Sequence, residues 1–145
     1  MFRVIIVTHG RLAAALLESA GMILGKVPDG VQGICLCPQD NLESARRKIL
    51  SALGPNERSG ISSQALVLVD LFGGTACNAA AWASEERDFQ IIAGVNLPML
   101  LEIMVSRDHL SVSQAALAAM EAGTKSVVDV RAALSLATKP ETRES

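Results

Sequence analysis

Aromatic residues are scarce in this sequence: its 145 residues include three Phe, one Trp and no Tyr. Half of the residues are hydrophobic, so any core must be built mainly from Val, Ile, Leu, Ala and Met. A chain of about 150 residues buries roughly 68–70% of its unfolded surface, which allows one aliphatic core without disulfide cross-links. The length therefore fits a single domain and leaves little room for two.

Long hydrophobic runs are also missing. No apolar segment approaches the roughly 20 residues that a membrane-spanning helix needs, and Met1-Phe2-Arg3 leads directly into a strand pattern without the hydrophobic region of a signal peptide. Of the three Cys, Cys35 and Cys37 have the wrong spacing for a C-x-x-C redox pair and would face opposite sides of a strand. We expect a cytoplasmic protein whose cysteines are reduced and structural, with no metal site.

An excess of positive charge is absent as well: 13 Lys and Arg stand against 15 Asp and Glu, for a formal net charge of −2. No basic stripe alternates with aromatic residues, so nucleic-acid binding is not expected. The densest basic run, Arg46-Arg47-Lys48, is interpreted as the solvated face of a helix. The sequence contains neither G-x-G-x-x-G nor G-x-x-x-x-G-K, so it predicts no dinucleotide or ATP cofactor.

Two short apolar runs stand out because each ends abruptly at a chemically active residue. Residues 4–7 lead into Thr8-His9-Gly10, and residues 65–69 lead into Asp70. Their continuous, rather than alternating, hydrophobic character is typical of strands that helices cover on both faces of a parallel sheet. A turn and a helical pattern follow each run.

Strand and helix patterns alternate along the chain, which predicts an α/β fold with right-handed crossovers. The predicted strands are 2–8, 31–37, 65–70, 89–93 and 125–130. The predicted helices are 11–24, one capped by Asp40 or Asn41 that runs to about Leu53, 75–84, 96–105 and one from Ser111 or Ser113 to Met120, stopped by Gly123. We expect a doubly wound, mainly parallel sheet of order 2-1-3-4 with helices on both faces and a last strand exchanged between subunits. Residues 54–63 are predicted to form a loop, and the domain, 1–135, to be followed by a flexible tail, 136–145.

The predicted strand order reverses between the first and third strands, and sheets of this kind bind ligands at such a point, outside the carboxyl ends. His9 and Asp70 end these two strands, so we expect their side chains to meet. An unprotonated imidazole is a nucleophile at neutral pH. A carboxylate on its other nitrogen holds the tautomer and stabilises the cation that forms on attack. The pair therefore predicts nucleophilic catalysis by His9, with Asp70 as its partner.

Two turns beside this pair are predicted to bind phosphate. Phosphoryl transfer needs mainly positioning and charge stabilisation, and a helix N-terminus supplies backbone N–H groups and roughly half a positive charge. The candidate phosphate-binding residues lie at the starts of the first and third predicted helices: Gly10, Arg11, Gly73, Gly74 and Thr75.

At these positions the sequence resembles the enzyme IIA domain of the mannose family of the bacterial sugar phosphotransferase system. The matching segments are Thr8-His9-Gly10, Leu16-Leu17 through Ile23-Leu24-Gly25, Cys37-Pro38 with its acidic follow-on, Val69-Asp70-Leu71-Phe72-Gly73-Gly74-Thr75, Asn78-Ala79-Ala80 and residues 93–99. They occur in order across most of the chain, to about residue 130. The sequence departs from the family at Phe72, where Trp is usual, and at Thr75-Ala76, where Ser-Pro is usual; Thr75 keeps the hydroxyl.

The resemblance implies a phosphotransferase component with a phosphohistidine at His9, oriented by Asp70, and a phosphate pocket lined by Gly73, Gly74 and Thr75. Such a domain accepts the phosphoryl group from HPr and passes it to a histidine of a IIB protein, which serves sugar uptake through the membrane components IIC and IID. The family forms a homodimer whose last strand crosses to the other subunit. No IIB domain is attached in this sequence, so we expect the acceptor on another chain; the sugar is left open.

Two other functions stay open from the sequence. A regulatory module would keep the fold and the phosphorylated state but signal to a partner instead of feeding transport. A histidine phosphatase would carry Arg immediately before the active histidine, to clamp phosphate, where this chain has Thr8. It would also need a second active histidine, and His109, in a polar stretch with Arg107 and Asp108, is interpreted as a surface residue.

Overall fold

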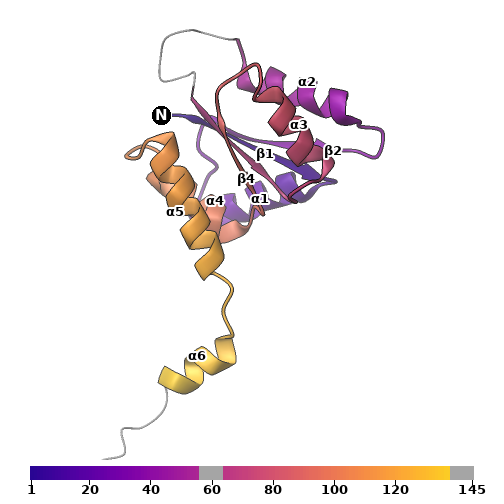
Figure 1. Ribbon diagram of the computed structural model, residues 1–145. Helices are drawn as coiled ribbons and strands as arrows, with labels where there is room; N and C mark the ends of the chain where they lie inside the picture. The colour runs from indigo at the N-terminus through magenta and orange to yellow at the C-terminus, as the bar shows by residue number, and fades with distance from the viewer. Residues whose placement is uncertain (56–63, 138–145) are drawn as a thin grey trace, which may run out of the picture.

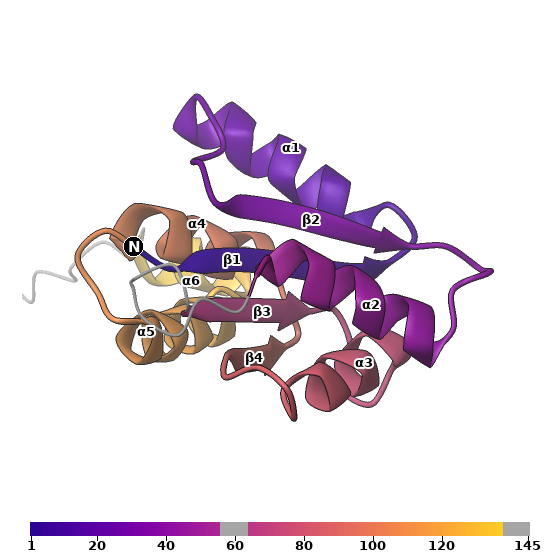
Figure 2. The same ribbon diagram turned by 90° about the horizontal axis from the view of Figure 1, so that it is seen from above.

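Four parallel strands form the centre of the fold. The computed structural model describes residues 1–55 and 64–137. The strands are β1 (Arg3–His9), β2 (Val31–Leu36), β3 (Ala65–Val69) and β4 (Gln90–Ala93). They lie in the order β2-β1-β3-β4, and all three neighbouring pairs are parallel (Figure 2). The predicted α/β fold with strand order 2-1-3-4 is confirmed.

Helices cover both faces of the sheet, as predicted. The helices of the described residues are α1 (Leu12–Leu24), α2 (Leu42–Leu53), α3 (Thr75–Ala83), α4 (Leu97–Ser106), α5 (Val112–Lys125) and α6 (Val130–Ala137). Helices α2 and α3 lie on one face, and α1, α4 and α5 on the other (Figure 1). Because successive strand residues point to opposite faces, Val4 and Ile6 of β1 pack in one half of the core and Ile5 and Val7 in the other, all fully buried.

Side-chain caps start three of these helices where the sequence predicts that they begin. Asn41 accepts the N–H of Ser44, and the Ser44 hydroxyl accepts the N–H of Asn41, at the start of α2. The side chain of Asn96 caps α4, and that of Ser111 caps α5. Each such cap contributes about 1 kcal/mol to stability. The elements that carry the site are therefore held by local as well as core interactions.

The C-terminal part of the fold differs from the prediction. Helix α5 continues past Gly123 to Lys125, and the chain then leads into α6. The predicted strand over 125–130 is therefore wrong, and the described residues contain no fifth strand to exchange between subunits. Gly123 does not stop the helix, because its role is close packing on α4: a Cβ there would lie 3.0 Å from Asn96 Nδ2 and 3.1 Å from Met99 Cε.

Helix α6 lies beyond the end of α5, away from the sheet (Figure 1). It reaches Ala137 and so includes the first two residues of the predicted tail, 136–145; the remainder of that segment lies outside the described residues. Most of the predicted loop, 54–63, lies outside them as well. None of the described helices combines the length and the apolar character that a bilayer crossing requires.

Candidate active site

His9 and Asp70 are in contact at the carboxyl edge of the sheet. Strands β1 and β3 are neighbours, and their pairing ends at Val7 and Val69, just before these two residues. The main-chain N–H of His9 donates to Asp70 Oδ2 at 2.9 Å, and His9 Nδ1 lies 2.9 Å from the same oxygen. The strand order thus brings the two side chains together, as the sequence predicts.

The imidazole is accessible, whereas the carboxylate that holds it is mostly buried: the side chains of His9 and Asp70 are 52% and 14% exposed. Burial by itself would raise the pKa of Asp70, but the hydrogen bonds from the main chain and ring of His9 outweigh it and lower that pKa below its ordinary value. Asp70 is therefore an ionised acceptor at neutral pH. It follows that Nδ1 carries the ring hydrogen and that the lone pair of the neutral imidazole is on Nε2.

The His9 ring packs against the turn between β3 and α3. A Cβ on Gly74 would lie 3.1 Å from His9 Cε1 and 3.7 Å from His9 Nε2, so only a glycine leaves the ring its full space. Gly74 is also the N-cap of α3. The positive end of the helix dipole therefore lies beside the free ring nitrogen, where it favours negative charge.

A cavity of about 320 Å³ opens beside His9. The predicted site residues that line it are His9, Gly10 and Thr75. Asp70 and Gly74 do not line the cavity but contact the His9 ring: Asp70 is hydrogen-bonded to it, and Gly74 packs against it. Arg11 and Gly73 do not line the cavity. Arg11 is exposed at the N-cap of α1. Gly73 lies in the turn just before Gly74 and has a φ of +81°, which glycine adopts without strain.

The cavity also has a wall that the site prediction missed. The additional lining residues are Leu36, Cys37, Pro38 and Asp40. They stand at and after the end of β2, whose last residue, Leu36, pairs with His9. The strand order is the signal that could have found them, because order 2-1-3-4 places the carboxyl end of the second strand beside that of the first.

Asp40 holds this second wall together. Its carboxylate accepts hydrogen bonds from the N–H and the thiol of Cys37 at 2.9 and 3.2 Å, from the Ser44 hydroxyl at 2.8 Å and from the Lys48 ammonium at 2.7 Å. The bond from Lys48 is the main reason that the pKa of Asp40 lies far below its ordinary value, and the N–H of Cys37 adds to it. The charge of Asp40 in this second wall is therefore balanced by Lys48 and not by a residue of the His9 site.

Thr8 anchors the start of α1 behind the cavity. Its side chain is fully buried, and its Oγ1 accepts the N–H of Ala13 at 2.7 Å. Because Arg11 makes no side-chain cap at this helix, the acceptor comes from the end of β1 instead. The position before His9 is therefore structural, and it offers no arginine clamp of the kind that a histidine phosphatase uses.

Comparison with known proteins finds similar sequences and folds in sugar phosphotransferase systems. The EIIA-man family, described as "PTS system fructose IIA component", matches residues 3–120. The chain is 38% identical over 112 residues to the sorbose-specific EIIA component of Lacticaseibacillus casei, covering 77% of this chain and 78% of that protein. It is 39% identical over 114 residues to the fructose-specific EIIA component of Bacillus subtilis (strain 168), covering 77% and 74%. The crystal structure of phosphotransferase system component EIIA from Streptococcus agalactiae has a TM-score of 0.80 at 26% identity, covering 91% of this chain and 99% of that one.

Proposed function

Since the chain belongs to the mannose-type EIIA family of the sugar phosphotransferase system, we propose that it accepts a phosphoryl group from phospho-HPr on His9 and passes it to a histidine of a IIB protein. The observation that supports this most directly is the 2.9 Å contact of His9 Nδ1 with Asp70 Oδ2 on an accessible imidazole. A carrier needs a nitrogen nucleophile that partners can reach, in a fixed tautomer. His9 meets both requirements.

The first transfer forms a bond between His9 Nε2 and phosphorus and breaks the phosphorus–nitrogen bond of the HPr phosphohistidine. The electron pair of the broken bond stays on the HPr imidazole. As positive charge develops on the His9 ring, the Asp70 carboxylate stabilises it through Nδ1–H. The second transfer repeats the exchange, with the IIB histidine as the nucleophile and His9 as the leaving group.

The surroundings of Nε2 suit the oxygens of a phosphoryl group. We assign phosphate binding to Gly10, Gly74 and Thr75, because the first and last line the cavity and Gly74 opens the N-terminus of α3 beside the ring. Helix N-termini favour anions through their free N–H groups. We place Arg11 and Gly73 at the periphery: Arg11 is exposed, and the Gly73 carbonyl accepts a hydrogen bond from Asn78 at 3.2 Å, which supports the turn.

We also propose that the protein works as a cytoplasmic homodimer that serves membrane components IIC and IID. The dimer is supported by apolar side chains in the C-terminal segment: Val127, Val128 and Val130 are 88%, 57% and 64% exposed. Exposed apolar residues that gather in one segment are typical of protein–protein contacts. Because this segment leads into a helix, the contact between subunits would use α6 and the residues before it rather than an exchanged strand.

The phosphorylation assay tests the proposal directly. Incubation with phosphoenolpyruvate, enzyme I and HPr is expected to add one acid-labile phosphoryl group, which intact-protein mass spectrometry detects. His9→Ala is expected to abolish the labelling. His109→Ala removes the second of the two histidines in the sequence, an exposed one, and should label like the wild type. Labelling of the His9→Ala protein at the wild-type level would show that the site is elsewhere.

A further inference from the structure

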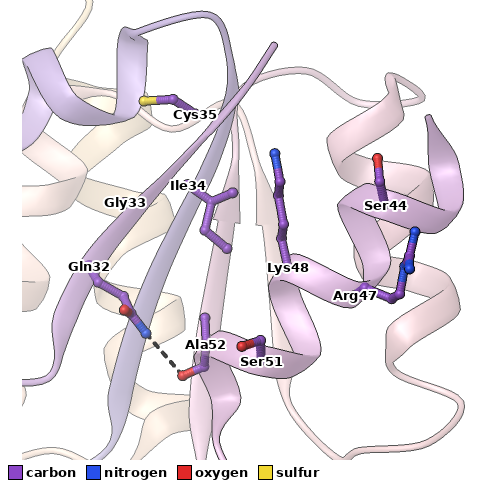
Figure 3. Close-up of a pocket in the computed structure, with 9 residues that line it drawn as sticks. All are labelled: Gln32, Gly33, Ile34, Cys35, Ser44, Arg47, Lys48, Ser51 and Ala52. Atoms are coloured by element: carbon purple, nitrogen blue, oxygen red, sulfur yellow. Dashed lines mark hydrogen bonds between the residues drawn. The ribbon is translucent and has the colours of Figure 1, made fainter. Parts of the chain in front are cut away.

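A second hollow lies between the edge strand β2 and helix α2, outside the His9 cavity (Figure 3). It encloses about 720 Å³. We call it the β2–α2 groove; its lining residues are Gln32, Gly33, Ile34 and Cys35 of the strand and Ser44, Arg47, Lys48, Ser51 and Ala52 of the helix. Figure 3 shows Gln32 and Ile34 directed to the α2 side of the strand, with Lys48 extending between strand and helix. Cys35 points to the opposite side, toward α1.

The edge of β2 that faces away from β1 has no main-chain partner among the described residues. Strand β2 pairs only with β1 within the described sheet. The carbonyl of Gly30 accepts a hydrogen bond from Val4 of β1, and that of Leu36 accepts one from Gly10, the residue after β1. Because the residues of a parallel strand alternate in the neighbour that they bond, Gly33 and Cys35 direct their N–H and C=O groups outward. The strand sequence, VQGICL, contains neither the charges nor the proline with which natural edge strands usually prevent further pairing.

The groove is positively charged on its helical side. Arg47 and Lys48 line it, and its lining includes no carboxylate. Lys48 is paired with Asp40, whereas the Arg47 side chain forms no ion pair or hydrogen bond with any described residue. An open strand edge with an apolar residue, Ile34, and an unpaired cation beside it fits an extended segment that brings an acidic side chain.

We propose that the β2–α2 groove binds an extended, acidic segment of a partner protein, which adds to the sheet beside β2. The main chain of that segment pairs with Gly33 and Cys35. Of its alternating side chains, one apolar residue covers Ile34 and an Asp or Glu reaches Arg47. A second copy of this chain is the weaker occupant, because two β2 edges placed together would bring the Arg47 and Lys48 side chains of both copies to one interface.

The groove is separate from His9, but two of its residues donate hydrogen bonds to Asp40 in the second wall of the His9 cavity. Ser44 and Lys48 line the groove and also donate to Asp40, which lines the His9 cavity. Binding in the groove does not require phosphorylation of His9. The proposal therefore goes beyond the phosphoryl carrier function, and His9→Ala is expected to bind the segment as the wild type does.

Selection of short random peptides displayed against the immobilised full-length chain is the test. The enriched peptides are expected to alternate β-branched residues with Asp or Glu. An enriched peptide should bind Arg47→Glu about tenfold or more weakly, the order of effect of one charge-assisted contact. Lys26→Glu, which reverses an exposed charge in the turn between α1 and β2, is the matched control and should bind as the wild type does.

Amide hydrogen exchange distinguishes pairing with the strand from a purely electrostatic contact. Peptide binding is expected to slow exchange at Gly33 and Cys35, in both the wild type and His9→Ala. The proposal is overturned if no peptide is enriched, if the enriched peptides are not acidic or ignore Arg47→Glu, or if the two amides stay unprotected. Protection that appears without peptide and grows with protein concentration would identify a second copy as the occupant, and would equally overturn it.

Discussion

Two carboxylates lie near His9, and they contribute to the site in different ways. Asp70, after β3, accepts from both the ring and the main chain of His9. Asp40, after β2, accepts from Lys48 and from its own loop and helix. Both have a lowered pKa. Only Asp70 bonds the His9 ring. The hydrogen-bond partner of a carboxylate, rather than its lowered pKa or its place near a cavity, therefore shows which of the two can act on the proposed nucleophile.

Removing the Asp70 carboxylate should slow phosphoryl transfer much more than removing the Asp40 carboxylate. Asp70→Ala deletes the acceptor of Nδ1–H, and one pKa unit on the imidazole corresponds to about 1.36 kcal/mol, or about tenfold in rate. We expect transfer from phospho-HPr to slow by about that factor or more, as measured by initial rates of labelling. Asp40→Ala is the control and should slow transfer by less than about threefold, because the Asp40 carboxylate bonds Lys48 and its own loop and helix rather than the His9 ring. Equal losses in the two variants would remove the distinction.

A smaller difference in transfer rate is expected between alanine variants of two adjacent glycines, Gly73 and Gly74. Gly74 has a φ of −78°, which alanine adopts readily, but its Cβ would press on His9 Cε1 at 3.1 Å. We expect Gly74→Ala to fold normally and to slow transfer by roughly threefold. A 1 Å misplacement of a reacting group can cost about a hundredfold in rate, and the His9 ring would need to shift by only a fraction of that. Gly73→Ala has open space but a positive φ, so it should cost about 1 kcal/mol of stability and leave the rate near normal. Rates and urea midpoints of both variants give the comparison.

The smallest effect should appear in the pH dependence of stability. A carboxyl whose pKa is lowered by folding stabilises the protein above the pKa of the unfolded state, and this contribution is lost as the pH falls through the folded value. Asp40→Asn should therefore have a lower urea midpoint than the wild type at neutral pH, with a difference that shrinks below about pH 4. Asp88→Asn, which removes an exposed carboxylate on another face, should show no such convergence.

Local patterns predicted the strands and placed His9 and Asp70 at their carboxyl ends, because a strand and its end are marked by short-range features of the sequence. Continuous apolar runs before His9 and Asp70 predicted two buried parallel strands, and the strand order then placed both residues at one edge. The same reasoning fails at the C-terminus, where the sequence predicts that Gly123 stops a helix. A glycine can end a helix or admit a neighbouring one, and which of these it does depends on contacts with α4 that are distant in the sequence.

The sequence by itself determined which segments form the four strands, which residues cap the helices, and that His9 and Asp70 stand at strand ends, because spacing, capping and hydrophobic pattern act over a few residues. Only the tertiary structure decided that the Asp40 wall closes the cavity, that Arg47 is left without a partner among the described residues beside an open strand edge, and that the last segment is a helix. These features arise where segments far apart in the chain pack together, and no local pattern specifies which side chains meet there.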